Sequence, residues 1–285
     1  MRRPWLMAVL PDRLCGLLVP YFRRHRNAWL PLYPNATLRF APQCALELVP
    51  GDVISDSIAF SGIWELRLSR HLLRRARRGG VMIEVGANLG YFSVLWAAAN
   101  ANNRVIAFEA SPRNVELLRR NVTRNNLGTR IQVIPCAASR HAGSLPFDLG
   151  PPDQTGWGGI AAAAGEGSIV VDVVRVDETI EGTGEIAFLK IDVEGADTWV
   201  LMGCERLLRE RRITEIWFEQ NKPRMRALGI GEAEAGDFLR SVGYELTPER
   251  DPSADVVDWL ATPMFVPPSR TALHHPSSAP HPPAR

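Results

Sequence analysis

The middle of the chain alternates short apolar runs with segments in which apolar residues recur at helical spacing. The apolar runs predict strands at residues 81–85, 104–108, 131–134, 169–174, 186–191 and 214–218. The helical spacing predicts helices at residues 63–78, 90–99, 112–125, 196–209 and 232–242. This order is typical of an α/β fold, with a mostly parallel twisted sheet and helices on both faces. Ligands of such folds bind at the carboxyl ends of the strands.

The two ends of the chain lack this regular order. Residues 1–60 have weak periodicity and many prolines, so we expect an irregular N-terminal accessory cap before an α/β domain at residues 61–266. Residues 267–285 are rich in Pro, Ser, His and Ala, which predicts a disordered tail whose histidines are not metal ligands. The Gly- and Ala-rich stretch 150–167 could be a lid over the site, but a plain surface loop is the more common outcome.

Composition and charge narrow the class of protein. With 46% hydrophobic and 22% charged residues, the 285-residue chain is neither disordered nor fibrous. The net charge is only +2, yet residues 1–78 hold 13 Arg and no Lys against 5 acids. A surface for nucleic acid or anionic lipid would explain this basic front. We favour a solvated helix face instead, because the arginines at 74–78 flank leucines at helical spacing.

The cysteines and the apolar segments indicate where in the cell the protein is expected. Cys15, Cys44, Cys136 and Cys204 are far apart and form no CxxC pair, so we expect reduced core residues and no zinc site. The apolar run near the N-terminus is too short for a signal peptide, and no stretch approaches the ~20 apolar residues of a membrane span. We therefore expect a cytoplasmic protein without a membrane span; its oligomeric state is not specified.

Two motifs follow the first two predicted strands. Strand 81–85 runs into Glu84-Val85-Gly86-Ala87-Asn88-Leu89-Gly90-Tyr91, where glycines allow close backbone approach and a helix start offers N–H groups to an anion. A dinucleotide fingerprint would need glycine at Asn88 and Tyr91, which disfavours an NAD-dependent oxidoreductase. Glu109 ends the second strand and is placed to bind a ribose diol, with a surface carboxylate as the alternative.

Charged residues interrupt the apolar strand 186–191 and its continuation. Lys190, Asp192 and Glu194 fall on one face, and Glu219 reaches the same sheet edge from the next strand. Buried charges are costly unless they are paired or functional, so these residues indicate chemistry or a Lys190–Asp192 pair that serves only the fold. Asp192 and Glu219 could also hold Mg²⁺, but a third ligand is not evident and no metal site is predicted.

Three segments together resemble the FkbM family of class I, Rossmann-like methyltransferases. They are EVGANLGYF (84–92), AFEASPR (107–113) and LKIDVEGA (189–196), and PGDVISDSIAFSGIWE (50–65) is similar to the lead-in of that family. The resemblance covers about residues 48–220. It implies S-adenosylmethionine as cofactor, and usually a hydroxyl acceptor on a sugar, a polyketide or a related metabolite.

The resemblance also implies positions for the cofactor. The residues expected around its methionine end are Glu84, Gly86, Asn88, Gly90 and Tyr91. Glu109 is expected at the ribose, Ala110, Cys136 and Ala137 beside the adenine, and Glu65 at the amino group. For Glu65, an exposed carboxylate at a helix start is almost as good an explanation.

The chain lacks the Asn/Asp-Pro-Pro-aromatic motif of enzymes that methylate exocyclic amines of nucleic-acid bases, which favours oxygen over nitrogen. We therefore predict S-adenosylmethionine-dependent O-methylation of a small, hydroxyl-bearing acceptor, with Asp192 as base or orienter and Lys190 and Glu219 in support. The alternatives are an RNA-directed methyltransferase that uses the basic front, although nucleic acid is the less favoured partner, an NAD-dependent oxidoreductase, and a non-catalytic cofactor-binding partner protein.

Overall fold

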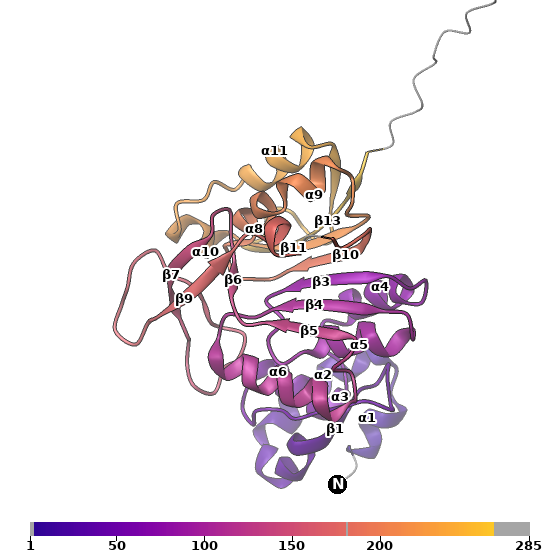
Figure 1. Ribbon diagram of the computed structural model, residues 1–285. Helices are drawn as coiled ribbons and strands as arrows, with labels where there is room; N and C mark the ends of the chain where they lie inside the picture. Colours follow the sequence, from indigo (N-terminus) through magenta and orange to yellow (C-terminus); the bar gives the residue numbers. More distant parts are fainter. Residues whose placement is uncertain (1–2, 181, 265–285) are drawn as a thin grey trace, which may run out of the picture.

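A seven-stranded sheet forms the centre of the computed structural model, which describes residues 3–180 and 182–264 (Figure 1). The strand order is β12-β13-β11-β10-β3-β4-β5. Five strands are parallel: β3 (Val81–Val85), β4 (Arg104–Phe108), β5 (Ile131–Ile134), β10 (Ile186–Ile191) and β11 (Ile216–Asn221). β13 (Val256–Pro263) runs antiparallel to both β11 and β12 (Tyr244–Pro248). The expected Rossmann-like α/β fold is confirmed; the tail expected at 267–285 lies outside the described residues.

Alternation along the strands divides the core into two layers, as period-two side-chain geometry requires. On one face, Met82, Phe188 and Trp217 share a core with α4 (Leu66–Ala76), α5 (Tyr91–Ala99) and α6 (Pro112–Arg124). On the other face, Ile83, Leu189 and Phe218 pack with α7 (Val176–Thr179), α8 (Asp197–Gly203), α9 (Glu205–Arg209) and α11 (Glu234–Ser241). A short helix, α10 (Lys222–Ala227), follows β11.

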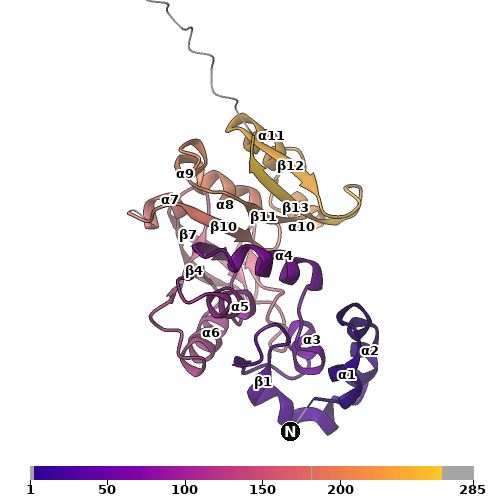
Figure 2. The same ribbon diagram turned by 90° about the vertical axis from the view of Figure 1, so that its right-hand side faces the viewer.

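The N-terminal part consists of short elements that join the first of these core layers. They are α1 (Trp5–Val9), α2 (Asp12–Arg24), the 3₁₀ segment η1 (Arg26–Asn35), β1 (Ala36–Thr37), β2 (Ala45–Leu46) and α3 (Val53–Ser61). β1 and β2 pair with each other, and the segment lies at the end of the molecule opposite β12 and α11 (Figure 2). No helix within residues 3–180 or 182–264 is long and apolar enough to cross a membrane.

A second sheet of four strands was largely missed by the sequence pattern. Its order is β6-β9-β7-β8, formed by β6 (Ala137–Ala138), β7 (Gly143–Asp148), β8 (Gly159–Ile160) and β9 (Ile169–Val174), and only β9 was predicted. β8 belongs to the stretch 150–167, for which we favoured a plain surface loop. That interpretation is wrong for residues 154 and 155, which are buried.

Three predicted boundaries also need correction. The helix expected at 63–78 begins only at Leu66, because α3 ends at Gly62 in the left-handed region (φ 76°) and the Ser57 and Ser61 hydroxyls both donate to the Ile63 carbonyl. The helix expected at 196–209 divides at Cys204 into α8 and α9, and the strand expected at 214–218 covers 216–221. Leu68, Leu72 and Leu73 of α4 are buried, whereas Arg74 of α4 and Arg77 and Arg78 just after it are exposed, as expected for a solvated arginine face.

Residues 149–160, which we call the strap, are tied to the N-terminal part through Asp52. One Asp52 oxygen accepts from the Thr155 backbone N–H (3.0 Å), and the other accepts from the Thr155 hydroxyl (3.1 Å) and from the Ser55 N–H (2.8 Å). The bond from Ser55 caps the N-terminus of α3. A single buried carboxylate therefore both begins a helix and holds the strap.

Replacing Asp52 by Ala should lower the free energy of unfolding by about 2–4 kcal/mol. The change removes a helix cap and leaves the buried Thr155 N–H without its acceptor, and both losses destabilise the folded state. Urea unfolding of both proteins gives the difference.

Asp153→Ala is the matched control, because Asp153 lies exposed in the same strap. Its effect should stay within about 0.5 kcal/mol. Equal effects of the two substitutions would show that Asp52 does not hold the strap.

Candidate functional site

A pocket opens at the carboxyl ends of β3, β4 and β10, where this fold binds its ligands. It contains about 1040 Å³ of space not filled by protein atoms, its open mouth included. The structure brings these sequence-predicted residues to its wall: Glu65, Glu84, Gly86, Asn88, Tyr91, Glu109, Ala110, Cys136, Ala137, Lys190, Asp192 and Glu219. Gly90 is not among the lining residues.

The turn after β3 depends on glycine. Gly86 has a φ of 81°, and a Cβ atom there would lie 1.9 Å from the carbonyl oxygen of Asp192. Only glycine therefore lets this turn meet the end of β10. Gly90 (φ 92°) has another reason, since a Cβ would meet Leu118 of α6 at 2.5 Å. Its role is to let α5 start close to α6.

Glu109 is a buried carboxylate with acceptor capacity to spare. Its Oε2 accepts from the Asn88 backbone N–H (2.7 Å) and its Oε1 from the Ser111 N–H (2.9 Å). Burial raises the pKa of Glu109, although these N–H groups oppose the shift. An ionised carboxylate offers about four lone-pair sites, so acceptor capacity remains for a ligand's hydroxyl. Glu109 is not the surface carboxylate that we kept as an alternative, since it is only 6% exposed.

Lys190 forms a buried ionic centre beneath the pocket. Its Nζ lies 3.2 Å from Asp192 Oδ2 and 3.9 Å from Glu84 Oε1, and 5.1 Å from the centre of the Phe92 ring. Burial alone would lower the pKa of Lys190, but the carboxylates of Asp192, Glu84 and Glu65 outweigh it and raise the pKa. The amine is therefore a permanent ammonium at neutral pH.

Glu84 and Tyr91 are held from behind by serines. Glu84 Oε2 accepts from the Ser93 hydroxyl at 2.5 Å, and burial raises the pKa of Glu84 to about 7 despite Lys190 and this bond. The Tyr91 hydroxyl lies 3.1 Å from the Ser69 oxygen. The Tyr91 ring therefore faces the pocket while its polar end is already engaged.

Several further carboxylates crowd the same edge of the sheet. Burial, followed by the charge of Asp192, raises the pKa of Glu65 to about 8, of Glu219 to about 10, of Glu194 to about 7 and of Asp197 to about 8. At neutral pH Glu219 consequently carries a proton and is a hydrogen-bond donor. Asp192 differs from these acids because it pairs directly with an ammonium and its side chain is 30% exposed.

Strained backbone marks the same place. Glu65, Asn88 and Glu194 have φ values of 41°, 51° and 56°, in the left-handed region that residues other than glycine rarely adopt. All three line the pocket; Asn126 and Arg211, the other two such residues in the described part of the chain, do not. Such conformations persist only where the surrounding structure holds them, and they cluster at functional sites.

Apart from Ile54 and Trp64, which belong to the segment 50–65, the sequence motifs did not reveal one wall of the pocket. It is built by the strap and by side chains that enter from distant elements, namely Ile54, Trp64, Phe147, Thr155, Gly156, Gly158, Gly159 and Ile160. Arg224 fastens this wall, since it donates to the Trp157 carbonyl (3.0 Å) and pairs with Glu194 (3.3 Å). The glycines at 156, 158 and 159 were the available signal: a Cβ on Gly159 would lie 3.2 Å from an Arg224 nitrogen.

The pocket fits an adenosyl cofactor. Asn88 Oδ1 and Asn114 Oδ1 are buried and have no hydrogen-bond partner within the described residues, so they can accept from a bound ligand. Glu109 keeps free acceptor sites at the end of the second strand of the sheet motif, where this architecture binds a ribose. Within the described ranges, no three His, Cys, Asp or Glu side chains are grouped so that they could hold a metal ion. Fold and site together are those of a Rossmann-like, S-adenosylmethionine-dependent methyltransferase.

Comparison with known proteins agrees with this class. The profile of the methyltransferase FkbM domain matches residues 84–246, more than half of the chain, and the chain belongs to this family. Methyltransferase sdnD of Sordaria araneosa is 24% identical, over 59% of this chain and 75% of that protein. The 31-O-demethyl-FK506 methyltransferase FkbM of Streptomyces tacrolimicus is 28% identical, over 62% and 76%. Among solved structures, the O-methyltransferase from Bacillus cereus in complex with SAH shares 12% identity, over 71% of this chain and 83% of that chain, at a TM-score of 0.40.

The raised pKa values of the buried acids predict that the stability of the protein depends on pH, and Asp197→Asn should weaken this dependence. The pKa of Asp197 rises from 3.8 to about 8 on folding, so the folded state keeps a proton that the unfolded state loses first. This contribution to stability is complete below 3.8, declines as the pH rises and is gone above about 8. In the variant, the decline should be shallower by up to about 1.4 kcal/mol per pH unit.

Urea unfolding of the ligand-free protein at a series of pH values measures this slope. Asp153→Asn, at an exposed position, should leave the slope unchanged. The assignment is wrong if wild type and Asp197→Asn lose stability in parallel between about pH 5 and about pH 8.

Proposed function

We propose that this methyltransferase methylates a hydroxyl oxygen of a small molecule, such as a sugar, a polyketide or a related metabolite. The observation that carries the proposal is the Asp192 carboxylate, which is partly exposed in the pocket and held 3.2 Å from the buried ammonium of Lys190. S-adenosylmethionine supplies a methyl carbon bound to a positively charged sulfur. An alcohol that attacks this carbon must lose its proton, and a positioned carboxylate can accept it.

The three residues at this edge take different roles. Asp192 receives the hydroxyl proton while the acceptor oxygen bonds the methyl carbon and the carbon–sulfur bond breaks, its electron pair leaving with the sulfur. Lys190 holds Asp192 in place and does not itself remove a proton, because its pKa is raised. Glu219, with a pKa of about 10, is protonated and serves as a donor that orients the acceptor.

The proposed cofactor contacts follow the pocket wall. Glu109 binds the ribose hydroxyls with its free lone pairs, and the turn at Gly86 and Asn88 receives the methionine end. Ala110, Cys136 and Ala137 flank the adenine. Glu65 binds the cofactor's ammonium, whose positive charge would favour the ionised form of this carboxylate.

Two observations support a small-molecule acceptor: the apolar residues that line one side of the pocket, and the name of one relative. Ile54, Trp64, Phe147 and Ile160 give the pocket an apolar side suited to a carbon skeleton. The name of the FkbM relative specifies methylation at an oxygen of its own substrate. Both support a hydroxyl on a small molecule over a nucleic-acid base.

Glu109→Ala should weaken S-adenosylmethionine binding by about 1.5–3 kcal/mol, because the ribose would lose a hydrogen bond to a charged group. Isothermal titration calorimetry of both proteins measures the difference. Glu116→Ala, at an exposed position of α6, is the control and should bind like wild type.

In the same titrations NAD should not bind the wild-type protein. Asn88 and Tyr91 stand where a dinucleotide-binding turn has the glycines that let its backbone approach the pyrophosphate. An affinity of Glu109→Ala within about twofold of wild type would refute the ribose contact.

Asp192→Asn should leave cofactor affinity nearly intact and reduce turnover by about 10² to 10⁴, the usual contribution of a positioned base. Asparagine keeps the volume of the side chain and removes the proton acceptor. Radioactive methyl incorporation from S-adenosylmethionine into an extract of small metabolites provides the assay while the acceptor is being identified.

Glu219→Gln is the matched control for this prediction. Because Glu219 is protonated at neutral pH, glutamine preserves its charge state, and turnover should fall by no more than about tenfold. Loss of wild-type activity with a chelator would assign Asp192 and Glu219 to a metal instead. Normal turnover of Asp192→Asn would leave the Lys190–Asp192 pair with a role in the fold alone.

A further inference from the structure

The first two helices expose an apolar face that no other described element covers. On α1, Trp5 is 75% and Val9 66% exposed; on α2, Leu17 is 74% and Tyr21 60% exposed. Leu14, Leu17 and Tyr21 follow one another at i, i+3 and i+7, so they form one stripe along α2. We call these five residues the outer face. Exposed apolar side chains that gather on neighbouring helices can mark binding surfaces in folded proteins.

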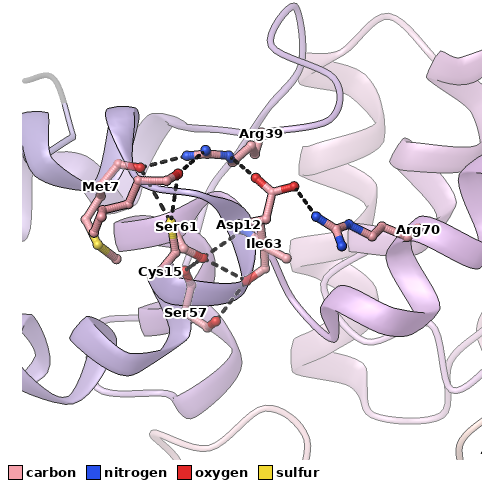
Figure 3. A network of polar contacts seen from close by, with 9 residues as sticks. Met7, Asp12, Cys15, Arg39, Ser57, Ser61, Ile63 and Arg70 are labelled. Atoms are coloured by element: carbon pink, nitrogen blue, oxygen red, sulfur yellow. Dashed lines mark hydrogen bonds and ion pairs between the residues drawn. The ribbon is translucent and has the colours of Figure 1, made fainter.

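A polar network on the inner side fixes this orientation (Figure 3). The guanidinium of Arg39 donates to the carbonyls of Met7 (2.7 Å) and Leu10 (2.6 Å) and to Asp12 Oδ1 (2.6 Å), which ties the turn between α1 and α2 to the protein. Arg70 of α4 holds the other oxygen of Asp12 at 2.9 Å. The outer face therefore belongs to a docked pair of helices with a fixed solvent side.

The buried side of α2 confirms which stripe faces outward. Cys15 and Phe22 are the buried residues of this helix, and Phe22 stacks on Phe60 of α3 at a centroid distance of 5.7 Å. At 100° per residue, Leu17 lies on the side of α2 away from these two residues, whereas Tyr21 lies at the edge of the stripe, where its ring meets the Phe22 ring edge-to-face at a centroid distance of 5.3 Å.

Arginines accompany the outer face on α2. Arg13 and Arg24 lie on the same exposed side of α2 as Leu17, and neither has an ion-pair partner in the described part of the chain. Asp12 is the only acid in residues 3–30, and it is already paired with Arg39 and Arg70. The surface thus combines apolar and aromatic side chains with free cations.

We propose that the outer face docks this protein on the surface of a bilayer that contains anionic phospholipids. Leucine and valine would enter the boundary of the acyl chains, Trp5 and Tyr21 suit the interface, and the arginines would contact lipid phosphates. Helices that lie in the plane of the interface have this combination and need no membrane span.

Self-association fits the same face less well. In a two-fold dimer through this patch, the same surface of both protomers would meet, so the side of α2 that carries Arg13 and Arg24 in one protomer would face that side in the other. Like charges at such an interface oppose binding, whereas an anionic membrane supplies the missing counter-charge.

Co-sedimentation of the full chain with vesicles tests the proposal. We expect binding to phosphatidylcholine–phosphatidylglycerol vesicles to be at least about tenfold tighter than to phosphatidylcholine alone, and to weaken with salt. Leu17→Asp should reduce it about tenfold or more, since the loss of one inserted leucine has this magnitude. Arg13→Gln with Arg24→Gln should reduce it about fivefold for each arginine.

Each variant has a matched control. Val170→Asp changes an equally exposed apolar residue (73%) of β9, and Arg77→Gln with Arg78→Gln changes exposed arginines after α4; neither should alter vesicle binding. Equal binding to both vesicle types, or equal losses in Leu17→Asp and Val170→Asp, would overturn the proposal. A concentration-dependent dimer that Leu17→Asp dissociates, without vesicle binding, would assign the face to a second copy and overturn it too.

Discussion

The buried ammonium of Lys190 is the interaction on which both the site and the register of the central sheet depend. In the β3–β10 pairing Lys190 lies opposite Glu84, and its Nζ sits between Glu84 and Asp192. Its neighbours Leu189 and Ile191 point into the opposite, fully apolar layer. A slip of one residue would place an ammonium in that layer and expose two apolar side chains to the carboxylates. The charge pairing therefore fixes which face of β10 meets the pocket.

The same cation accounts for the differences among the acids around it. One ammonium cannot neutralise Glu65, Glu84, Asp192 and Glu219 together, so burial and mutual repulsion raise the pKa values of most of them. Environments that push the pKa values of neighbouring carboxyl groups apart produce donors and acceptors at one pH. Under the proposed reaction, Asp192 at the ammonium is the acceptor and protonated Glu219 is a donor.

Local sequence signals predicted the layers of the fold but not all of its connections. Strands 131–134, 169–174 and 186–191 have the predicted bounds, because each is an apolar run closed by turn residues. The start of α4 was misplaced because helical spacing continues through residues 63–65, whereas hydrogen bonds to Ile63 and the left-handed backbone at Glu65 stop it. Strands of two residues, such as β6 and β8, exist only through their partners, which periodicity does not identify.

The pocket, too, has one part that local sequence predicts and one part that depends on contacts between distant residues. The motif residues follow strands that are neighbours in the sheet and run parallel, so their meeting at one sheet edge follows from topology alone. Ile54 and Thr155 reach it through Asp52, which joins positions about a hundred residues apart by hydrogen bonds that no local pattern encodes. Arg224 makes a comparable long-range link from α10 to the strap. Long-range hydrogen bonds, and not a local sequence pattern, therefore position the strap side of the pocket.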